Sequence, residues 1–383
     1  MSTAKSAPRL SDRQRFSWLR LIRTPNVGPA SFRDLVNKFG SAEAALEILP
    51  ELAIAGGAGR NIRIPSTGEI EAELEAARKH GARFVGIGEA DYPPLLKRME
   101  HPPPLLAVKG EAAVFSLPPI AIVGARNASL AGVRMARMLA AELGERGYGV
   151  VSGLARGIDT AAHDGSLATG TVAALAGGLD LPYPPENGEL VDRIVSGSGA
   201  VVSEMPFGWE PRAKDFPRRN RIIAGMSLGL IVVEAAKRSG SLISARLAGE
   251  MGRLVFAVPG SPLDPRAAGS NSLLKDGAIL VTEASDVIEA IAPLTGSTIQ
   301  IPPKMHDPAD IDISDFSSAE PPVQNDRERV VEALGPSPVG IDELIRHTRL
   351  QPAQVSAILL ELDLAGRLER HSGGRVALLP GDL

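Results

Sequence analysis

The chain has 383 residues, no cysteine and a formal net charge of −4. That length can hold a complete α/β core with one or two small additional domains. The absence of cysteine excludes disulfide frameworks, thiolate metal sites and cysteine nucleophiles. Slight net acidity argues against indiscriminate coating of nucleic acid, so such binding is expected only at a local patch. No run of 18 apolar residues and no signal-peptide core is present, which predicts a cytoplasmic protein without a membrane role.

The N-terminal residues 1–82 are predicted to form a small helical domain. Apolar residues at helical spacing indicate two helices between Ser11 and Phe39, joined by a short turn that contains Gly28. This arrangement resembles a helix-hairpin-helix or SAM-like unit, whose turn amides can contact a phosphate. Because Asn26 stands where glycine is usual, we favour a packing domain over a DNA-contacting one.

Residues 83–292 alternate between short apolar runs and helical patterns. A proline-rich stretch, Tyr92–Gly110, is predicted to be an extended connector. The alternation predicts an α/β fold with a Rossmann-like, doubly wound, mainly parallel sheet, in which ligands bind beyond the carboxyl ends of the strands. The runs that we expect to be its strands are Ile120–Gly124, Gly149–Ser152, Thr171–Ala176, Gly199–Ser203, Leu228–Glu234, Arg253–Pro259 and Ala278–Val281.

The C-terminal part divides into a linker and a further domain. Residues 293–325 mix proline, serine and aspartate without apolar periodicity, which predicts an acidic flexible linker. In residues 326–383, three helical patterns and a hairpin that turns at Gly373–Gly374 predict a winged helix. Its third helix, Gln351–Ala365, contains no Lys or Arg, whereas a helix that reads a DNA groove normally needs cations near the phosphates. We therefore favour a protein-contact or regulatory role for this domain over duplex binding.

A dense cluster of cations lies within the stretch from Pro211 to Ala224. Five cations stand against one acid, Asp215, and an aromatic residue, Phe216, lies among them. Guanidinium and ammonium groups beside an aromatic ring are used to follow a single-stranded nucleic acid. The alternative is a solvated charged loop before a helix. The five cations are Arg212, Lys214, Arg218, Arg219 and Arg221.

Small residues follow three of the predicted strands. The segments are Gly124–Ser129, Ser152–Asp159 and Ser239–Ser241, and the first two also contain an arginine. A helix that begins after such a turn presents free amides and the positive end of its dipole to an anion. Each turn alone could be an ordinary strand-to-helix connection. Together with the cationic stretch they favour a cradle for backbone phosphates.

Standard enzymatic motifs do not match. Neither the dinucleotide-binding Gly-x-Gly-x-x-Gly after the first strand nor a Walker motif occurs, so no cofactor is expected. Gly225–Gly229 matches Gly-x-Ser-x-Gly, but a helix precedes it and a strand follows, the reverse of a nucleophile elbow. The six histidines have no metal-ligand spacing. We expect no catalytic residue and no metal.

Several ordered motifs carry a resemblance to a known family. They are Ile122–Arg126, Ser152–Asp159 with Ala162–His163, Gly177–Asp180 with Tyr183–Pro184, Ser203–Glu204, Phe216–Gly225, Val233–Ala235, Ser239–Ser241 and Val255–Gly260. The sequence resembles the DNA-processing protein DprA (Smf) family. This resemblance implies a non-enzymatic protein that binds single-stranded DNA, protects incoming DNA in natural transformation and loads the RecA recombinase. It also implies a homodimer formed through the Rossmann-like domain.

The resemblance and the loop analysis together give the candidate nucleic-acid-binding residues. By motif, Arg126 would hold a phosphate and Phe216 would face a base, while Asn220 would brace the loop. Ala125 removes a hydroxyl that the family often has at this position. The full set is Gly124, Arg126, Ser129, Ser152, Gly153, Arg156, Lys214, Phe216, Arg218, Arg219, Asn220, Arg221, Ser239, Gly240 and Ser241.

Two alternatives stay open from the sequence. The first is a nucleotide-processing hydrolase that resembles the lysine-decarboxylase-like phosphoribohydrolases. Their Pro-Gly-Gly-x-Gly-Thr loop is absent, and Glu234 with Ser239–Ser241 resembles it only weakly. The second is a regulatory protein whose winged helix binds duplex DNA.

Overall fold

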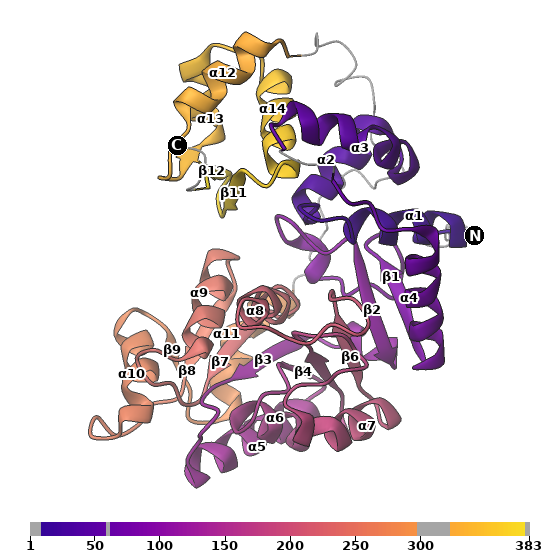
Figure 1. Cartoon of the computed structure of the whole chain (residues 1–383). Coiled ribbons are helices and arrows are strands. Elements are labelled where there is room, and N and C mark those ends of the chain that lie inside the picture. Colours follow the sequence, from indigo (N-terminus) through magenta and orange to yellow (C-terminus); the bar gives the residue numbers. More distant parts are fainter. Residues whose placement is uncertain (1–8, 59–61, 297–321, 380–383) are drawn as a thin grey trace, which may run out of the picture. The chain divides into compact units, whose positions relative to one another are not determined.

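The computed structural model describes residues 9–58, 62–296 and 322–379 (Figure 1). The described chain forms two compact units. One comprises the residues from Glu73 to Gly296, and the other combines Leu10–Ala72 with residues 322–379. The boundary falls within the helix α4 (Thr67–Lys79). Each unit is described separately below.

A nine-stranded sheet organises the first unit, with the order β1-β2-β6-β5-β4-β3-β7-β8-β9. Seven neighbouring strands, β6, β5, β4, β3, β7, β8 and β9, are parallel, and β2 is antiparallel to both β1 and β6. This arrangement confirms the predicted α/β class with a mainly parallel sheet. The strands are β1 (Ala82–Gly86), β2 (Leu105–Gly110), β3 (Pro119–Val123), β4 (Gly149–Ser152), β5 (Thr171–Ala174), β6 (Ala200–Ser203), β7 (Gly229–Val232), β8 (Leu254–Ala257) and β9 (Ile279–Leu280).

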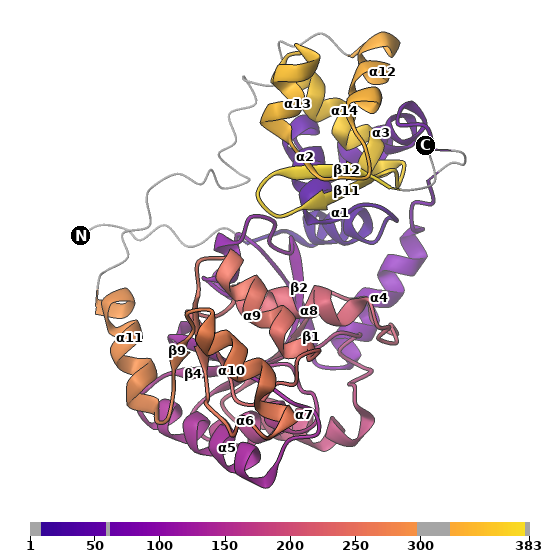
Figure 2. The same ribbon diagram turned by 90° about the vertical axis from the view of Figure 1, so that its left-hand side faces the viewer.

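Side-chain alternation along the strands builds a core on each face of this sheet. On β3, Ile120 and Ile122 point to one face, where helices α5, α6 and α11 pack, while Ala121 and Val123 point to the other, which α8 and α9 cover (Figures 1 and 2). The helices are α5 (Leu130–Glu145), α6 (Ile158–Ser166), α7 (Gly188–Ser196), α8 (Asp215–Gly225), α9 (Gly240–Glu250), α10 (Ala268–Lys275) and α11 (Ala284–Gly296). Short 3-10 turns are η1 (Leu96–Arg98), η2 (Ala112–Ser116), η3 (Pro185–Asn187) and η4 (Pro265–Ala267).

The direction of winding changes at the centre of the sheet. From β3 the chain continues to β4, β5 and β6 on one side, and it then returns to place β7, β8 and β9 on the other side. The loops after β3 and β7 therefore diverge and leave a crevice between adjacent strands. Doubly wound sheets bind ligands at such a switch point.

Three details of this unit differ from the sequence-based expectations. The expected connector Tyr92–Gly110 contains a strand, β2, which pairs with neighbours on both sides. The cationic stretch is mostly the helix α8 and not a loop. Helix α11 continues to Gly296, four residues into the expected linker, whose residues 297–321 lie outside the described ones.

The second unit joins the two ends of the chain. The N-terminal helices are α1 (Asp12–Ile22), α2 (Pro29–Phe39) and α3 (Ala42–Ala55), of which α3 was not expected. The C-terminal part is a winged helix, as predicted. Its elements are α12 (Gln324–Ala333), β10 (Val339–Gly340), α13 (Ile341–Thr348), α14 (Pro352–Leu364), β11 (Leu368–His371) and β12 (Arg375–Leu378), with the sheet order β10-β12-β11.

Helix α14, which would be the groove-reading helix, lies at the junction of these two parts. Asp363 accepts hydrogen bonds from the hydroxyl of Ser31 (2.7 Å) and from Nε of Arg370 (2.9 Å). Nδ2 of Asn26 donates to the carbonyl of Leu364 (3.1 Å). Most of the α14 side chains are buried. Because α2 and α3 pack on this helix, its position supports the expectation that it does not enter a DNA groove.

Candidate nucleic-acid interface

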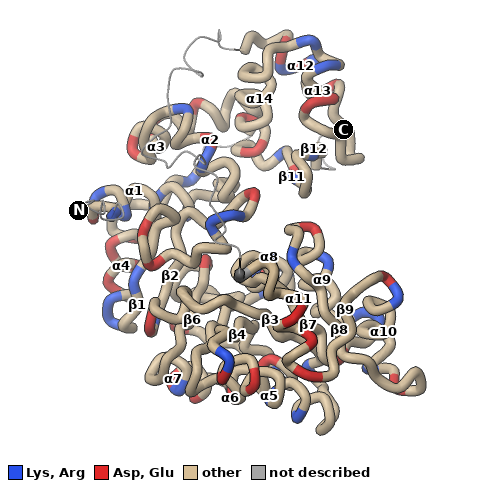
Figure 3. The backbone as a smooth tube through the Cα atoms, turned by 180° about the vertical axis from the view of Figure 1, so that it is seen from behind, with Lys and Arg blue, Asp and Glu red and all other residues tan. Residues whose placement is uncertain are grey.

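A cavity of about 700 Å³ lies at the switch point, beyond the carboxyl ends of β3 and β7. Its walls come from the loops after these strands and from the starts of α8 and α9. Over the whole described backbone, Lys and Arg positions are interspersed with Asp and Glu positions (Figure 3), so this gathering of cations is local. Four arginines line the cavity, namely Arg126, Arg219, Arg238 and Arg266.

Arg126 extends from the loop after β3 and lies over the ring of Phe216. Its guanidinium carbon is 5.0 Å from the centroid of the ring, and Tyr183 meets the same ring edge-on with centroids 5.7 Å apart. Arg126 is exposed and has no ion-pair partner among the described residues. The aromatic face expected to meet a base thus already carries a cation, which gives a planar guanidinium surface at the mouth of the cavity.

Arg219 lies beneath the cavity, and its hydrogen bonds are to the protein. It is only 6% exposed. Its guanidinium donates to the carbonyls of Gly153 and Ala174, the latter at 2.9 Å, and to Oδ1 of Asn220 at 3.2 Å. Burial lowers the pKa of Arg219 to about 10, although Asp159 opposes this effect. Arg219 is therefore a buried brace for the loops rather than a free phosphate ligand.

Two main-chain amides of the loop after β4 are hydrogen-bonded to a carboxylate and so are not open to a phosphate. Oδ2 of Asp159 accepts hydrogen bonds from the main-chain amides of Gly153 (3.1 Å) and Ala155 (3.3 Å). Burial raises the pKa of Asp159, and the nearby Arg219 lowers it in part. The hydroxyl of Ser152 is buried and donates to the carbonyl of Ile122 at 2.6 Å. Neither Ser152 nor Gly153 lines the cavity, so we leave both out of the proposed contact surface.

The start of α5 is likewise hydrogen-bonded to a carboxylate of the protein. Ser129 caps this helix by accepting from the amide of Gly132 at 2.9 Å. The carboxylate of Glu234, just after β7, accepts from both the amide and the hydroxyl of Ser129. A phosphate at this helix start would meet a carboxylate first, so we also leave Ser129 out.

The start of α9 remains open toward the cavity. Ser239 caps the helix, and its hydroxyl lies 2.7 Å from that of Ser241. Gly240 is exposed, and Nδ2 of Asn220 donates to its carbonyl at 3.4 Å, so Asn220 braces this turn. No carboxylate is hydrogen-bonded to these amides within the described chain. This helix start can therefore donate to an anion.

The remaining cations of α8 lie outside the cavity lining. Oε1 of Glu204 accepts from Nε of Arg218 at 2.7 Å, and Oε2 accepts from Arg221, which also donates to the carbonyl of His101 (3.2 Å). Lys214 is exposed at the N-terminus of the helix. Because a helix turns 100° per residue, cations that are adjacent in sequence project to different sides.

Sequence reasoning missed some residues of the cavity and its rim. Arg238 precedes the Ser239 turn, and Arg266 follows β8, where it forms an ion pair with Asp264 at 2.8 Å. Tyr183 follows β5 and is 46% exposed. A search for cations and aromatic residues throughout the loops that follow the predicted parallel strands, rather than in one dense stretch, would have found them.

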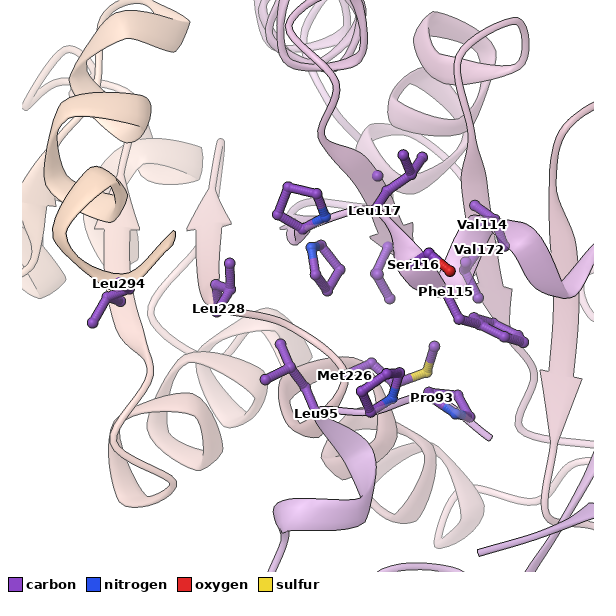
Figure 4. Close-up of a pocket in the computed structure, with 15 residues that line it drawn as sticks. Pro93, Leu95, Val114, Phe115, Ser116, Leu117, Val172, Met226, Leu228 and Leu294 are labelled. Atoms are coloured by element: carbon purple, nitrogen blue, oxygen red, sulfur yellow. The ribbon is translucent and has the colours of Figure 1, made fainter. Parts of the chain in front are cut away.

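A second cavity, of about 420 Å³, has a different character. It is lined mainly by apolar residues such as Leu95, Phe115 and Met226 near the amino ends of the parallel strands (Figure 4). No Lys or Arg is among its lining residues. It therefore offers nothing to a polyanion.

The described residues contain no group of three or more potential metal ligands, and none of their helices is long and apolar enough to cross a membrane.

Comparison with known proteins agrees with the resemblance. Residues 83–292 match the family model described as DNA recombination-mediator protein A. Residues 12–76 match the DprA-like N-terminal HHH domain, and residues 314–374 match the DprA winged helix domain. The Smf protein of Escherichia coli (strain K12) is 38% identical over 315 residues, which cover 81% of each chain.

Two solved structures are similar to the chain as well. The X-ray structure of DNA processing protein A from Streptococcus pneumoniae has a TM-score of 0.59 at 32% identity and covers 74% of this chain and 98% of its own. A structure of the Helicobacter pylori protein, described by its single-stranded DNA binding mode, has a TM-score of 0.50 at 27% identity, with 55% and 96% coverage. The chain belongs to the DNA-processing protein A (DprA, Smf) family of DNA recombination mediators.

Proposed function

We propose that the cavity at the switch point binds the backbone of single-stranded DNA. The observation that carries this proposal is the exposed Arg126, which lies over Phe216 beside the open start of α9. Exposed guanidinium groups, helix amides and aromatic surface in one groove are the components of single-strand binding sites. The Helicobacter pylori relative is described as binding single-stranded DNA, which supports the same assignment here.

The residues around the cavity divide this task. Arg126 and Arg238 neutralise phosphates, and Arg266 contributes in part because Asp264 already pairs with it. The amides and hydroxyls of Ser239–Ser241 donate to a further phosphate oxygen. Bases contact the planar surface of Arg126 and the ring of Phe216. Because these contacts are to phosphates and to ring faces, binding is expected to depend little on base sequence.

The hydrolase alternative gains no support from the geometry. It would need Glu234 to act on a nucleotide, but both carboxylate oxygens of Glu234 are hydrogen-bonded to Ser129.

The test is filter binding of single-stranded and double-stranded oligonucleotides by the wild type, Arg126→Ala and the control Arg146→Ala. Arg146 is also exposed but lies at the other end of α5. Loss of one phosphate contact with its stacking surface should weaken single-strand binding about tenfold or more in Arg126→Ala only. Equal binding by all three proteins would contradict the proposal.

The wider role proposed is that of a cytoplasmic homodimer that protects incoming single strands in natural transformation and loads RecA onto them. Membership in a family of recombination mediators supports it. The test is RecA assembly on single-stranded DNA. The wild type should accelerate it and Arg126→Ala should not, while sedimentation measures the dimer. Acceleration by Arg126→Ala equal to that of the wild type would contradict the link between this cavity and loading.

A further inference from the structure

Beyond the cavity, exposed aromatic and cationic side chains continue along the same edge of the sheet. Tyr183, after β5, is 46% exposed, and the side chain of Arg156, after β4, is 61% exposed. Neither residue is among those that line the cavity, and Tyr183 lies only at its rim.

Contacts join these two residues to the cavity. The ring of Tyr183 meets the ring of Phe216 edge-on at 5.7 Å between centroids. Gly157 packs against the loop that carries Arg126, since a Cβ on Gly157 would lie 2.6 Å from the carbonyl oxygen of Arg126. The amide of Ile158 also donates to the carbonyl of Ala125 at 3.2 Å. The loops after β3 and β4 are thus held side by side.

The loop of Tyr183 is in turn anchored to the loop of Arg156. Nδ2 of the buried Asn187 donates to the carbonyl of Leu154 at 2.8 Å and lies 3.1 Å from Oγ1 of Thr160. The pKa of Arg156 is raised, mainly by its hydrogen bond to Glu186 and in smaller part by Tyr183, which is consistent with their proximity. Tyr183 and Arg156 are therefore positioned by packed structure and not left on a free loop.

We propose that Tyr183 and Arg156 form a second nucleotide subsite, in which Tyr183 stacks with a base and Arg156 contacts a neighbouring phosphate. The subsite extends the strand bound at the cavity, so this inference rests on the proposed function. Tyr183 presents a partly exposed ring that is held by its T-shaped contact with Phe216, and a single strand, unlike a duplex, has free base faces to place on it. Arg156 exchanges its exposed carboxylate partner, Glu186, for a phosphate.

The arrangement also predicts the length of strand that is bound. The loops that follow β8, β7, β3, β4 and β5 lie along four strand spacings of about 4.8 Å, which total about 19 Å. At a rise of about 3.4 Å per nucleotide, a stacked strand covers this distance with up to about six nucleotides, and a stretched one needs fewer. Short oligonucleotides fill the cavity alone, and longer ones also reach Tyr183.

The experiment measures the affinity of the full chain for oligothymidylates of two to ten nucleotides. The variants are Tyr183→Ala, Tyr183→Phe and Arg156→Ala. Leu181→Ala, in the same loop, and Arg193→Ala, whose exposed side chain pairs with Asp164 much as Arg156 pairs with Glu186, serve as controls. Since stacking of one base on an aromatic ring contributes about 1–3 kcal/mol, Tyr183→Ala should weaken binding of the longer oligonucleotides about 5- to 150-fold. Tyr183→Phe keeps the ring and should bind as the wild type does.

The outcomes separate this inference from the function on which it rests. If Arg126→Ala weakens every length but Tyr183→Ala weakens none, the second subsite is contradicted and single-strand binding stands. If Tyr183→Phe loses as much as Tyr183→Ala, stacking is contradicted. If the wild type itself binds no oligothymidylate, the proposed function fails and the subsite fails with it.

Discussion

The carboxylate of Glu234 accepts two hydrogen bonds from Ser129, one from its main-chain amide at 2.9 Å and one from its hydroxyl. This pair ties the segment after β7 to the start of α5, and it places a negative charge where a helix would otherwise receive an anion. In the proposed function, this charge directs the strand to the start of α9.

Removal of this charge should tighten DNA binding. In Glu234→Gln the amide group can still accept from the Ser129 amide, so the loop keeps its position while repulsion of phosphates is lost. One charge near a helix terminus changes the binding free energy by roughly 0.5–1 kcal/mol, about two- to fivefold in affinity. Filter binding at low and high salt measures this, and the gain should shrink at high salt. Weaker binding by Glu234→Gln at low salt would show that the carboxylate does not oppose the strand.

Close packing of α5 on Glu234 predicts an unusual response to alanine. Gly132 is buried within α5, and a Cβ there would lie 2.6 Å from the carboxyl carbon of Glu234. Gly132→Ala should therefore lower the free energy of unfolding by about 1–3 kcal/mol, although alanine normally favours a helix. The control is Gly249→Ala in α9, where no atom beyond the adjoining residues and backbone of its own helix lies within 4 Å of the new Cβ, and a gain of about 0.5–1 kcal/mol is expected. Urea denaturation of both variants measures these changes, and a stabilised Gly132→Ala would contradict the packing.

A buried histidine should make the stability of the first unit sensitive to acid. Thr171 donates its hydroxyl proton to the carbonyl of Val150, so Nδ1 of His163 donates to Thr171 Oγ1 at 2.8 Å. Burial, with a smaller contribution from Arg219, lowers the pKa of His163 to about 3. Below about pH 6.5 the unfolded chain binds a proton that the folded state does not bind until about pH 3. The free energy of unfolding therefore decreases as the pH is lowered across that window.

The size of this effect can be isolated with His163→Asn, whose amide can still donate to Thr171. Asp159, with its raised pKa, acts in the opposite direction in both proteins and cancels in the comparison. Between pH 6.5 and 4 the wild type should lose up to about 1.4 kcal/mol more per pH unit than the variant, measured by urea denaturation. Parallel pH profiles of the two proteins would contradict a neutral buried imidazole.

The fold was largely predictable from the sequence because its strands are short apolar runs that alternate with helices. The winding order, and with it the switch point between β3 and β7, is a property of the pairing of distant segments and is not encoded in any local pattern. For the same reason the prolines before β2 predict a connector, although this strand pairs on both sides.

The candidate site was predictable only in part. Arg126, Phe216 and Ser239–Ser241 do line one cavity. The local density of charge in α8 does not reveal where its cations lie. Glu204 forms ion pairs with Arg218 and Arg221, and Arg219 is buried against main-chain carbonyls. Likewise, the helix start at Ser129 has the composition of an anion site, but Glu234, 105 residues away in sequence, fills it. Whether a helix start is free or hydrogen-bonded to a distant carboxylate depends on tertiary contacts, which no local sequence pattern shows.

The second unit should depend on one ion pair that crosses the winged helix. Arg327 forms two hydrogen bonds with the carboxylate of Glu361, at 2.7 and 2.8 Å, and the Glu361 side chain is only 4% exposed. Glu361→Ala leaves a partly buried guanidinium unpaired and should cost about 3–5 kcal/mol. The exposed Glu369→Ala should change stability by less than about 0.5 kcal/mol. Thermal unfolding with hydrogen exchange in residues 322–379 distinguishes the two, and equal stability would contradict a structural role for this pair.

The central claim is that exposed cations at the switch point neutralise the phosphates of a single strand. The most direct measurement is the slope of log affinity against log salt concentration for a single-stranded oligonucleotide. For an oligonucleotide short enough to fill the cavity alone, Arg126 and Arg238 each neutralise one phosphate and Arg266 up to one. The wild type should therefore give about −1.4 to −2, and Arg126→Ala/Arg238→Ala should give a slope no steeper than about −0.7. A flat wild-type slope, or an unchanged slope in the double variant, would contradict the account.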